Sequence, residues 1–274
     1  MLEILHDLFS YTFIVRALIV GTLVSLCAAL LGVSLVLKRY SMIGDGLSHV
    51  GFGALAVAMA FNWAPLPVAI PVVVVAAFLL LRLSENSKIK GDSAIALIAS
   101  SSLAIGVTVI SLASGQNADV YSYMFGSILA MKESDVYVSI ALSVVVLILF
   151  IAFYNKIFAV TFDENFAKAT GTRANLYNML IALLTAVTIV VGMRIMGTML
   201  ISSLIIFPAL SAMRIFRQFR SVVIASAVIS IICFFIGLVA SYAFSTPTGA
   251  SIVIVNLIVF LLCFAAGLIR KKAA

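Results

Sequence analysis

The sequence predicts an all-α, polytopic helical membrane protein with about nine transmembrane helices, with eight to ten allowed. Of the 274 residues, 64% are hydrophobic and only 10% are charged, whereas a soluble domain carries about 25% charged residues. Each crossing of the hydrocarbon core takes roughly 20 apolar residues, and long apolar runs fill this chain. We therefore expect one transmembrane domain over residues 1–274 and no soluble domain.

Basic residues and helix-breaking prolines separate the apolar runs of the first half. The first run ends at Lys38-Arg39, and the second ends before a turn that contains Pro65 and Pro67. A polar loop over 84–92 follows the third run. We predict four crossings here, namely Thr12 to Leu37, a short one ending near Phe61, one reaching about Leu81, and Ser93 to about Ala113.

The second half contains one short apolar run and five long ones. The run from Val120 to Met131 is too short to cross, so we expect a re-entrant or surface helix there. The 156–175 segment is the longest polar connection of this half. The five predicted crossings are one reaching Tyr154, Leu176–Val191, Thr198–Met213, Val222–Phe244, and a last one that ends at Arg270-Lys271-Lys272.

The basic residues predict the orientation. Fourteen of the 17 lysines and arginines lie in alternate loops, which leaves only Arg16, Lys132 and Arg194 for the other side. Because cytoplasmic loops carry the excess of Lys and Arg, we expect the 156–175 loop and the C-terminus in the cytoplasm. The formal net charge is +7, but basic tracts beside apolar runs indicate membrane topology and no nucleic-acid partner.

Asp45 and His49 are the candidate metal-binding residues. They are four residues apart, so on a helix both side chains lie on one face, one turn apart. A carboxylate and an imidazole at this spacing can bind one divalent cation, and ionisable residues at membrane depth usually mark an ion or substrate path. The alternative is structural: Asp45 would cap a helix that starts at Gly46, and His49 would be a buried histidine bonded to a carbonyl.

Residues 162–171 are predicted to contain a short helix in the long polar connection. Asp163 and Glu164 suit its first turn, and Gly171 suits its end. The side chains that would line one side are Phe162, Phe166 and Ala169. A helix this short needs something to pack on. We interpret the segment as a docking helix for a cytoplasmic partner, with a surface helix lying on lipid headgroups as the alternative.

The motifs of several enzyme classes are absent. The sequence holds no G-x-x-x-x-G-K-[ST] phosphate loop, no H-E-x-x-H and no G-x-S-x-G, which argues against ATP binding of that kind, an intramembrane metalloprotease and a serine hydrolase. Three cysteines, Cys27, Cys233 and Cys263, lie in apolar runs without a CxxC pair, so no thiolate metal site is predicted. We expect a protein that is not an enzyme and has no tightly bound cofactor.

Four collinear stretches resemble the permease subunits of bacterial ABC importers for zinc and manganese, the ABC-3 metal permease family, over nearly the full chain. The stretches are Lys38 to His49, Phe162 to Gly171, Gly197 to Ala209 with Pro208, and Pro247 to Val253. The resemblance implies a bundle like that of type II ABC importers. One difference is Gly51-Phe52-Gly53 after His49, where many members carry an apolar-Pro-Gly segment, and it leaves the geometry of the site open.

The resemblance also implies roles and partners. Asp45 and His49 would contact the metal in the translocation path of an importer that works by alternating access. Segment 162–171 would be the coupling helix that sits in a groove of the ATPase, and its implied contact residues are Phe162, Asp163, Glu164, Phe166, Ala169 and Gly171. The implied partners are a cytoplasmic ATP-binding subunit, an extracytoplasmic metal-binding protein and a second copy of the permease in the bacterial cytoplasmic membrane.

The cargo follows less directly than the family. One carboxylate and one imidazole suit zinc, manganese or ferrous iron, and the lack of thiolates argues against Cu(I). The stretches Tyr123 to Ala130 and Thr246 to Gly249 look more like the zinc members, so we favour zinc, with manganese as the alternative. Three rivals stay open. One is an importer for a siderophore or cobalamin, which needs a wide cavity, and another is a stand-alone secondary transporter, which needs no docking helix. The third is a structural membrane protein without transport, in which Asp45 and His49 are packing features.

Overall fold

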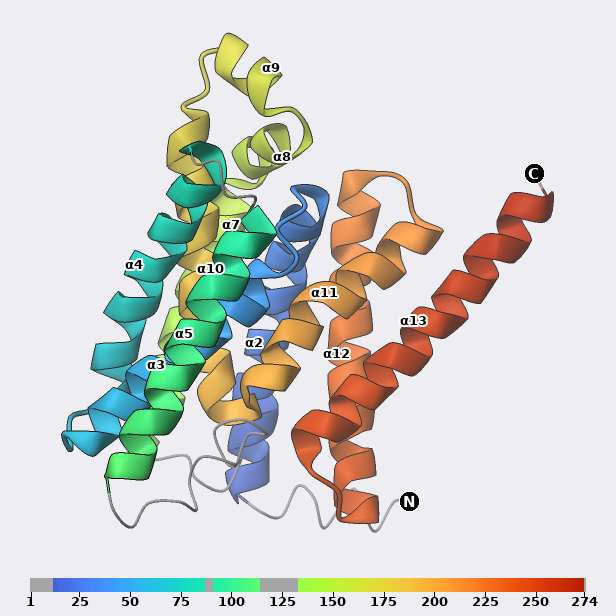
Figure 1. Ribbon diagram of the computed structural model, residues 1–274. Coiled ribbons are helices and arrows are strands. Elements are labelled where there is room, and N and C mark those ends of the chain that lie inside the picture. The colour runs from blue at the N-terminus through green and yellow to red at the C-terminus, as the bar shows by residue number, and fades with distance from the viewer. Residues whose placement is uncertain (1–11, 87–90, 114–132, 274) are drawn as a thin grey trace.

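The computed structural model describes residues 12–86, 91–113 and 133–273, and these residues form helices and no strand (Figure 1). Nine of the described helices are long and apolar enough to cross a membrane, which confirms the prediction of a polytopic helical protein. They are α2 (Thr12–Leu37), α3 (Ile43–Ala60), α4 (Pro65–Asn86), α5 (Gly91–Leu112), α7 (Glu133–Ala152), α10 (Ala174–Met196), α11 (Thr198–Ile215), α12 (Phe219–Phe244) and α13 (Thr248–Ala273). The predicted helix over 120–131 lies outside the described residues.

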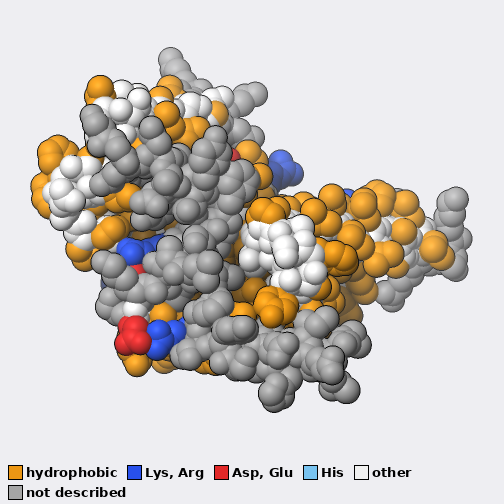
Figure 2. Space-filling model, turned by 90° about the horizontal axis from the view of Figure 1, so that it is seen from below, with side chains coloured by type: hydrophobic (Ala, Val, Ile, Leu, Met, Phe, Trp, Pro, Cys, Tyr) orange, Lys and Arg blue, Asp and Glu red, His pale blue; other side chains and the backbone are white. Residues whose placement is uncertain are grey.

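Two short helices, α8 (Tyr154–Phe162) and α9 (Glu164–Ala169), connect α7 to α10. They lie at one end of the bundle, at the top of Figure 1, and α13 finishes at the same end. We call this the α9 end. Seen from the opposite end, the hydrophobic side chains of α13 form an arm that extends away from the other helices (Figure 2). Among the described helices, α13 packs mainly against α11 and α12.

Most predicted boundaries agree with the helices, but α10 is longer than its apolar run at both ends. Its backbone hydrogen bonding continues past Val191 to Met196 and ends at Gly197, whose N–H donates to the Met193 carbonyl. Gly197 has φ +85°, a conformation open mainly to glycine. One residue therefore ends α10 and begins α11, so that the chain reverses without a loop.

Helix α3 is the central helix of the part of the bundle that surrounds the site. It packs against α4, α5, α10 and α11, and 13 of its 18 residues are buried. Because lipid tails are as apolar as the helices, membrane helices associate through close packing, which small residues permit. The sequence of α3, with Gly44, Gly46, Gly51 and Gly53, fits this position.

Different glycines of α3 face different neighbours. A Cβ at Gly53 would lie 2.7 Å from the Ser102 carbonyl oxygen of α5, and one at Gly51 would lie 2.4 Å from the Met193 sulfur of α10. Both distances are shorter than a carbon contact allows. The Met193 side chain can move, but the Ser102 carbonyl belongs to the backbone of α5, so α3 and α5 approach as closely as they do only with glycine at position 53. α3 runs without interruption through Gly51-Phe52-Gly53, and the site therefore sits on a regular helix.

Helix α2 is held in the same way. A Cβ at Gly32 would lie 2.0 Å from the Ile205 carbonyl oxygen of α11. On another face, the Ser226 and Ser230 hydroxyls of α12 donate to the α2 carbonyls of Ala29 and Ser25, at 3.2 and 3.0 Å. Small residues thus place α2 and α11 in backbone contact.

We expect Gly32→Ala to destabilise the fold by about 1–3 kcal/mol, because the carbonyl that its methyl group meets belongs to a rigid helix backbone. Gly44→Ala is the matched control, since its Cβ would meet the flexible end of the Ile205 side chain at 3.0 Å. Thermal unfolding of the purified protein in detergent measures both. A Gly32→Ala protein as stable as the wild type would contradict the close approach of α2 and α11.

Candidate metal site and docking helix

Asp45 and His49 lie on one face of α3, as their spacing predicts. α3 begins at Ile43, so Asp45 is in its first turn and His49 is one turn further. Both side chains line a cavity of about 510 Å³ between α3 and α5, together with Ile95, Ala99 and Ser100 of α5. The Asp45 side chain is 43% exposed and that of His49 is 23% exposed, so an ion can reach both.

The two polar groups are close but not hydrogen-bonded to each other. His49 Nε2 lies 3.7 Å from Asp45 Oδ2, which is too long for a hydrogen bond. Two ligand atoms at about 2.1 Å from one metal ion are about 3.0–3.4 Å apart, so a small side-chain rotation would bring both onto one ion. The Ser202 hydroxyl of α11 lies 3.5 Å from Asp45 Oδ1. Its oxygen is therefore a third potential metal ligand, beside the carboxylate and the imidazole.

The structural alternative for this pair is wrong. The N-cap position of α3 is Met42, with no side-chain hydrogen bond, so Asp45 does not cap the helix. Among the residues that the structure describes, His49 Nδ1 is buried and has no hydrogen-bond partner, so a carbonyl does not satisfy this histidine. A buried imidazole nitrogen without a partner costs free energy, and the other ring nitrogen, Nε2, is the one that faces Asp45.

The described part of the chain contains no group of three or more His, Cys, Asp and Glu side chains that could hold a metal. One carboxylate and one imidazole, with hydroxyl oxygens beside them, make a site far from the closed four-ligand cage of a structural zinc. A transport site must release its ion, and two protein ligands suit this. Sequence reasoning treated Ser202 only as a small packing residue and did not detect Ser100.

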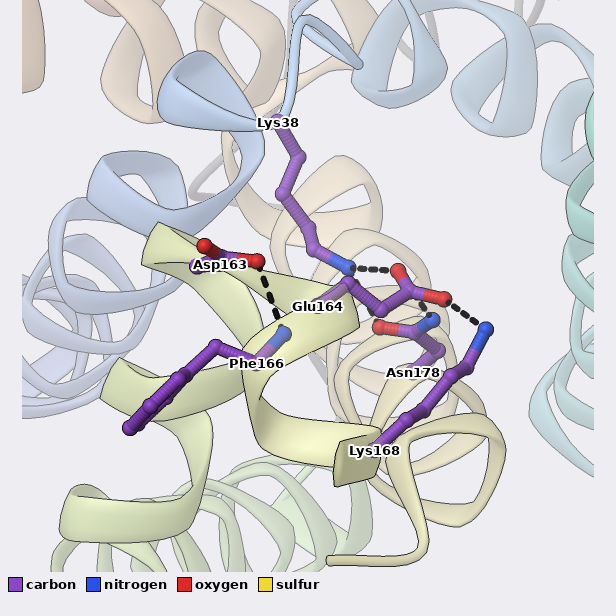
Figure 3. Close-up of polar contacts among 6 residues, drawn as sticks. All are labelled: Lys38, Asp163, Glu164, Phe166, Lys168 and Asn178. Carbon is purple, nitrogen blue, oxygen red and sulfur yellow. Dashed lines mark hydrogen bonds and ion pairs between the residues drawn. The ribbon is translucent and has the colours of Figure 1, made fainter. Parts of the chain in front are cut away.

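The ends of α9 are capped as predicted. Asp163 has an extended backbone, and its Oδ1 accepts the Phe166 N–H at 2.9 Å (Figure 3). At the other end, the Gly171 N–H donates to the Lys168 carbonyl and the Thr172 N–H to the Ala167 carbonyl, which is the Schellman arrangement. Gly171 has φ +80°, as this arrangement favours. The six-residue helix α9 is therefore capped at both ends, by the Asp163 side chain and by the backbone conformation of Gly171.

Glu164 fastens α9 to the transmembrane helices. Its Oε2 accepts hydrogen bonds from Lys38 Nζ at 3.2 Å and Asn178 Nδ2 at 3.0 Å, and its Oε1 lies 2.8 Å from Lys168 Nζ (Figure 3). Lys38 also donates to the Asn178 side-chain carbonyl. Lys38 follows α2 and Asn178 lies on α10, so this group joins three elements. The sequence predicted Glu164 as a first-turn residue but gave no signal for Lys38 or Asn178, since these contacts are tertiary.

The charges around Glu164 change its pKa. Partial burial raises the pKa of this carboxyl, but the hydrogen bonds from Lys168 and Asn178 and the charge of Lys38 outweigh it and lower the pKa from 4.5 to about 2. Because this pKa is lower in the folded state than in the unfolded state, the ionised carboxylate stabilises the folded protein at pH values above the ordinary pKa of glutamate. The stabilisation is lost as the pH falls from about 4.5 towards 2.

The aromatic residues of the segment point outward, but they do not share one helix. Phe166 on α9 is 65% exposed and Phe162 is 77% exposed, whereas Ala167 is buried. Phe162 is the last residue of α8, and the extended Asp163 separates it from α9. The expectation that Phe162, Phe166 and Ala169 line one helix side is therefore wrong for Phe162. Ala169 and Gly171 are exposed at the far end of α9.

Comparison with known proteins identifies the family. The ABC 3 transport family matches residues 10–267. The chain belongs to this family. As an ABC 3 family permease it is a transport component and not an enzyme, and the ATPase of such a transporter is a separate subunit.

Named relatives and solved structures resemble this ABC 3 family permease over most of its length. The manganese import system permease protein ScaB of Streptococcus gordonii is 29% identical over 91% of this chain and 89% of its own, and the manganese transport system membrane protein MntC of Halalkalibacterium halodurans is 27% identical over 89% and 84%. The structure of PsaBC from Streptococcus pneumoniae in complex with Fab has a TM-score of 0.86, at 29% identity over 96% of this chain and 94% of that chain. A transporter assigned to the metal-chelate ABC type, in an inward-facing conformation, shares the fold with a TM-score of 0.72 at 15% identity, over 92% and 86% of the two chains.

We expect Glu164→Gln to lower the stability by about 1–2 kcal/mol at neutral pH, because a hydrogen-bonded charge is lost from a partly exposed group. The difference from the wild type should shrink as the pH falls from about 4.5 towards 2, because in this range the carboxyl takes up a proton in the unfolded state but stays ionised in the folded one. Thermal unfolding in detergent across this pH range measures it, with Asn165→Ala, an exposed change on the same helix, as the control. A difference that does not depend on pH would contradict the ionised carboxylate.

Proposed function

We propose that this ABC 3 family permease carries a divalent transition metal through the bilayer by binding it transiently at Asp45 and His49. The observation that carries the proposal is the pair of side chains on one face of α3, 3.7 Å apart at the wall of a cavity of about 510 Å³. Alternating access would open this cavity to one side of the membrane at a time. Membership in an ABC family disfavours a stand-alone secondary transporter.

For the cargo we propose manganese, with zinc as the alternative. The two relatives reported above are named for manganese, and a carboxylate and hydroxyl oxygens around one imidazole suit a metal that prefers oxygen ligands. Zinc, which the sequence favoured, rested on stretches away from this site. One of them, 123–130, lies outside the described residues, and the other forms the turn into α13. Uptake of labelled manganese and zinc, each competed by the other, separates the two metals.

We further propose that α9 is the coupling helix for a cytoplasmic ATP-binding subunit. Phe166 offers an exposed aromatic anchor on a helix capped at both ends, and aromatic anchors tend to carry much of an interface's energy. Lys38, which donates a hydrogen bond to Glu164 of α9, precedes Asp45 by seven residues in the chain. Movement of α9 could thereby reach the metal site through Lys38 and the short connection to α3.

The remaining partners follow from the orientation that we propose. The α9 end faces the cytoplasm of a bacterial cell, because the alternate loops that hold 14 of the 17 basic residues include the 156–175 segment that carries α9. The opposite end would then receive the metal from an extracytoplasmic binding protein. A second copy of the permease completes the transporter, and α5, which lines the metal cavity, has an exposed face that such a copy could cover.

Asp45→Asn should reduce metal uptake at least roughly ten-fold, because it keeps the size of the side chain and removes the charge that attracts the ion. Even changes to groups that only support metal ligands cost 10–100-fold. Uptake into cells that lack their own manganese and zinc importers measures this effect. Glu133→Gln removes an exposed carboxylate elsewhere and should leave uptake unchanged. Uptake close to wild type with Asp45→Asn would remove Asp45 from the site.

Phe166→Asp should release the ATPase or uncouple it, because a charge replaces the exposed aromatic ring of α9. Phe166→Leu keeps an apolar side chain and should retain both binding and transport. Co-purification of the ATPase and metal uptake are measured in the same cells, and metal binding by the purified permease should stay unchanged in both variants. If Phe166→Asp kept the ATPase and full uptake, α9 would be a helix lying on lipid headgroups.

A further inference from the structure

A groove of about 920 Å³ lies at the α9 end, between α8 and the start of α12. We call it the α8–α12 groove. One wall carries Ile151, Tyr154, Phe158 and Phe162, and the other carries residues 217–220, Val223 and Ile224. Neither the metal site nor the exposed Phe166 belongs to its lining. The contents of its two ends indicate what it binds.

One end of the α8–α12 groove is cationic. Arg217 and Arg220 both line it and are both exposed, and no acidic residue is among its lining residues. Burial raises the pKa of Tyr154, and the positive charge of the nearby Arg220 partly opposes this effect. Arginine guanidinium groups bind phosphate through two parallel hydrogen bonds. This end therefore suits a phosphate.

The rest of the groove lining is largely apolar, and part of it is exposed. Ile151 is 69% exposed and Ile224 is 55% exposed, and both belong to apolar spans, α7 and α12. The aromatic rings in the lining pack on one another at a tilt, with the Phe158 and Phe219 centroids 4.9 Å apart. Since the span of α12 begins at Phe219, the groove crosses from headgroup depth into the hydrocarbon region.

The part of the chain that forms the α12 wall carries an excess of basic residues. Residues 165–274 contain nine lysines and arginines and no aspartate or glutamate. The positive-inside rule explains why such residues lie in the loops, but it does not require two of them to line a groove that continues along apolar and aromatic side chains. A molecule with a negative headgroup and a hydrocarbon chain matches both ends at once.

We propose that the α8–α12 groove binds an anionic phospholipid. Its phosphate lies between Arg217 and Arg220, and an acyl chain follows Ile151 and Ile224. Basic pockets beside transmembrane helices bind lipid headgroups in this manner. An acidic segment of a protein would use the arginines but would leave the exposed isoleucines at membrane depth without a partner. Bound there, the lipid would bridge α8, which leads into α9, and α12.

Native mass spectrometry of the purified full-length protein in detergent tests the proposal. Phosphatidylglycerol and phosphatidylcholine with the same acyl chains are titrated separately, and wild type is expected to bind the anionic lipid more tightly. The double variant Arg217→Gln/Arg220→Gln should lose at least roughly ten-fold of phosphatidylglycerol affinity, since each basic residue near anionic lipid contributes several-fold. Its phosphatidylcholine affinity should stay unchanged.

Two further variants keep the test decisive. Arg82→Gln removes an exposed arginine at the same end but outside the groove, and it should bind phosphatidylglycerol as the wild type does. Ile224→Trp fills the apolar end at an exposed position and leaves both arginines in place, so it should weaken phosphatidylglycerol even if the double variant fails to fold. Equal affinity of wild type and Ile224→Trp, or displacement of the lipid by inorganic phosphate alone, would overturn the proposal.

Discussion

The fold depends on backbone-to-backbone packing at glycines. In hydrocarbon there is no aqueous phase to drive apolar helices together, so close contact and polar ties must hold them. α3 meets this constraint at Gly53 against the backbone of α5, and α2 meets it at Gly32 against the backbone of α11. The position of Asp45 and His49 follows from it. A helix enclosed by α4, α5, α10 and α11 can present a carboxylate and an imidazole to a cavity only on the face that its packing leaves open.

A second constraint joins the two functional regions. The Glu164 carboxylate is shared by Lys38 and Asn178, and Lys38 leads into the short connection that ends at Ile43, the first residue of α3. The helix proposed to meet the ATPase and the helix that carries Asp45 and His49 are thereby linked through one ion pair and five residues of chain. The connection between the two regions is therefore short, and it consists of covalent bonds and part-buried polar contacts.

Local chemistry explains what the sequence predicted well. Apolar length located the nine spans, the four-residue spacing placed Asp45 and His49 on one face, and Asp163 and Gly171 marked both ends of α9. The interactions that could not be predicted from the sequence depend on tertiary contacts. Ser202 reaches Asp45 from 157 residues away, and Asn178 becomes a partner of Glu164 only when α9 folds back on α10. Phe162 was assigned to the wrong helix because no neighbouring residue indicates that Asp163 adopts an extended backbone.

The uneven distribution of ionisable groups has a consequence for acid response. Residues 165–274 hold nine lysines and arginines but no aspartate, glutamate or histidine. Lysine and arginine keep their charge throughout the physiological range, with ordinary pKa values of about 10.4 and above. The charge of α10 to α13 is therefore constant between about pH 5 and pH 8. Any proton-linked change in this permease must begin in the first 164 residues, where both histidines and all ten carboxylate side chains are found.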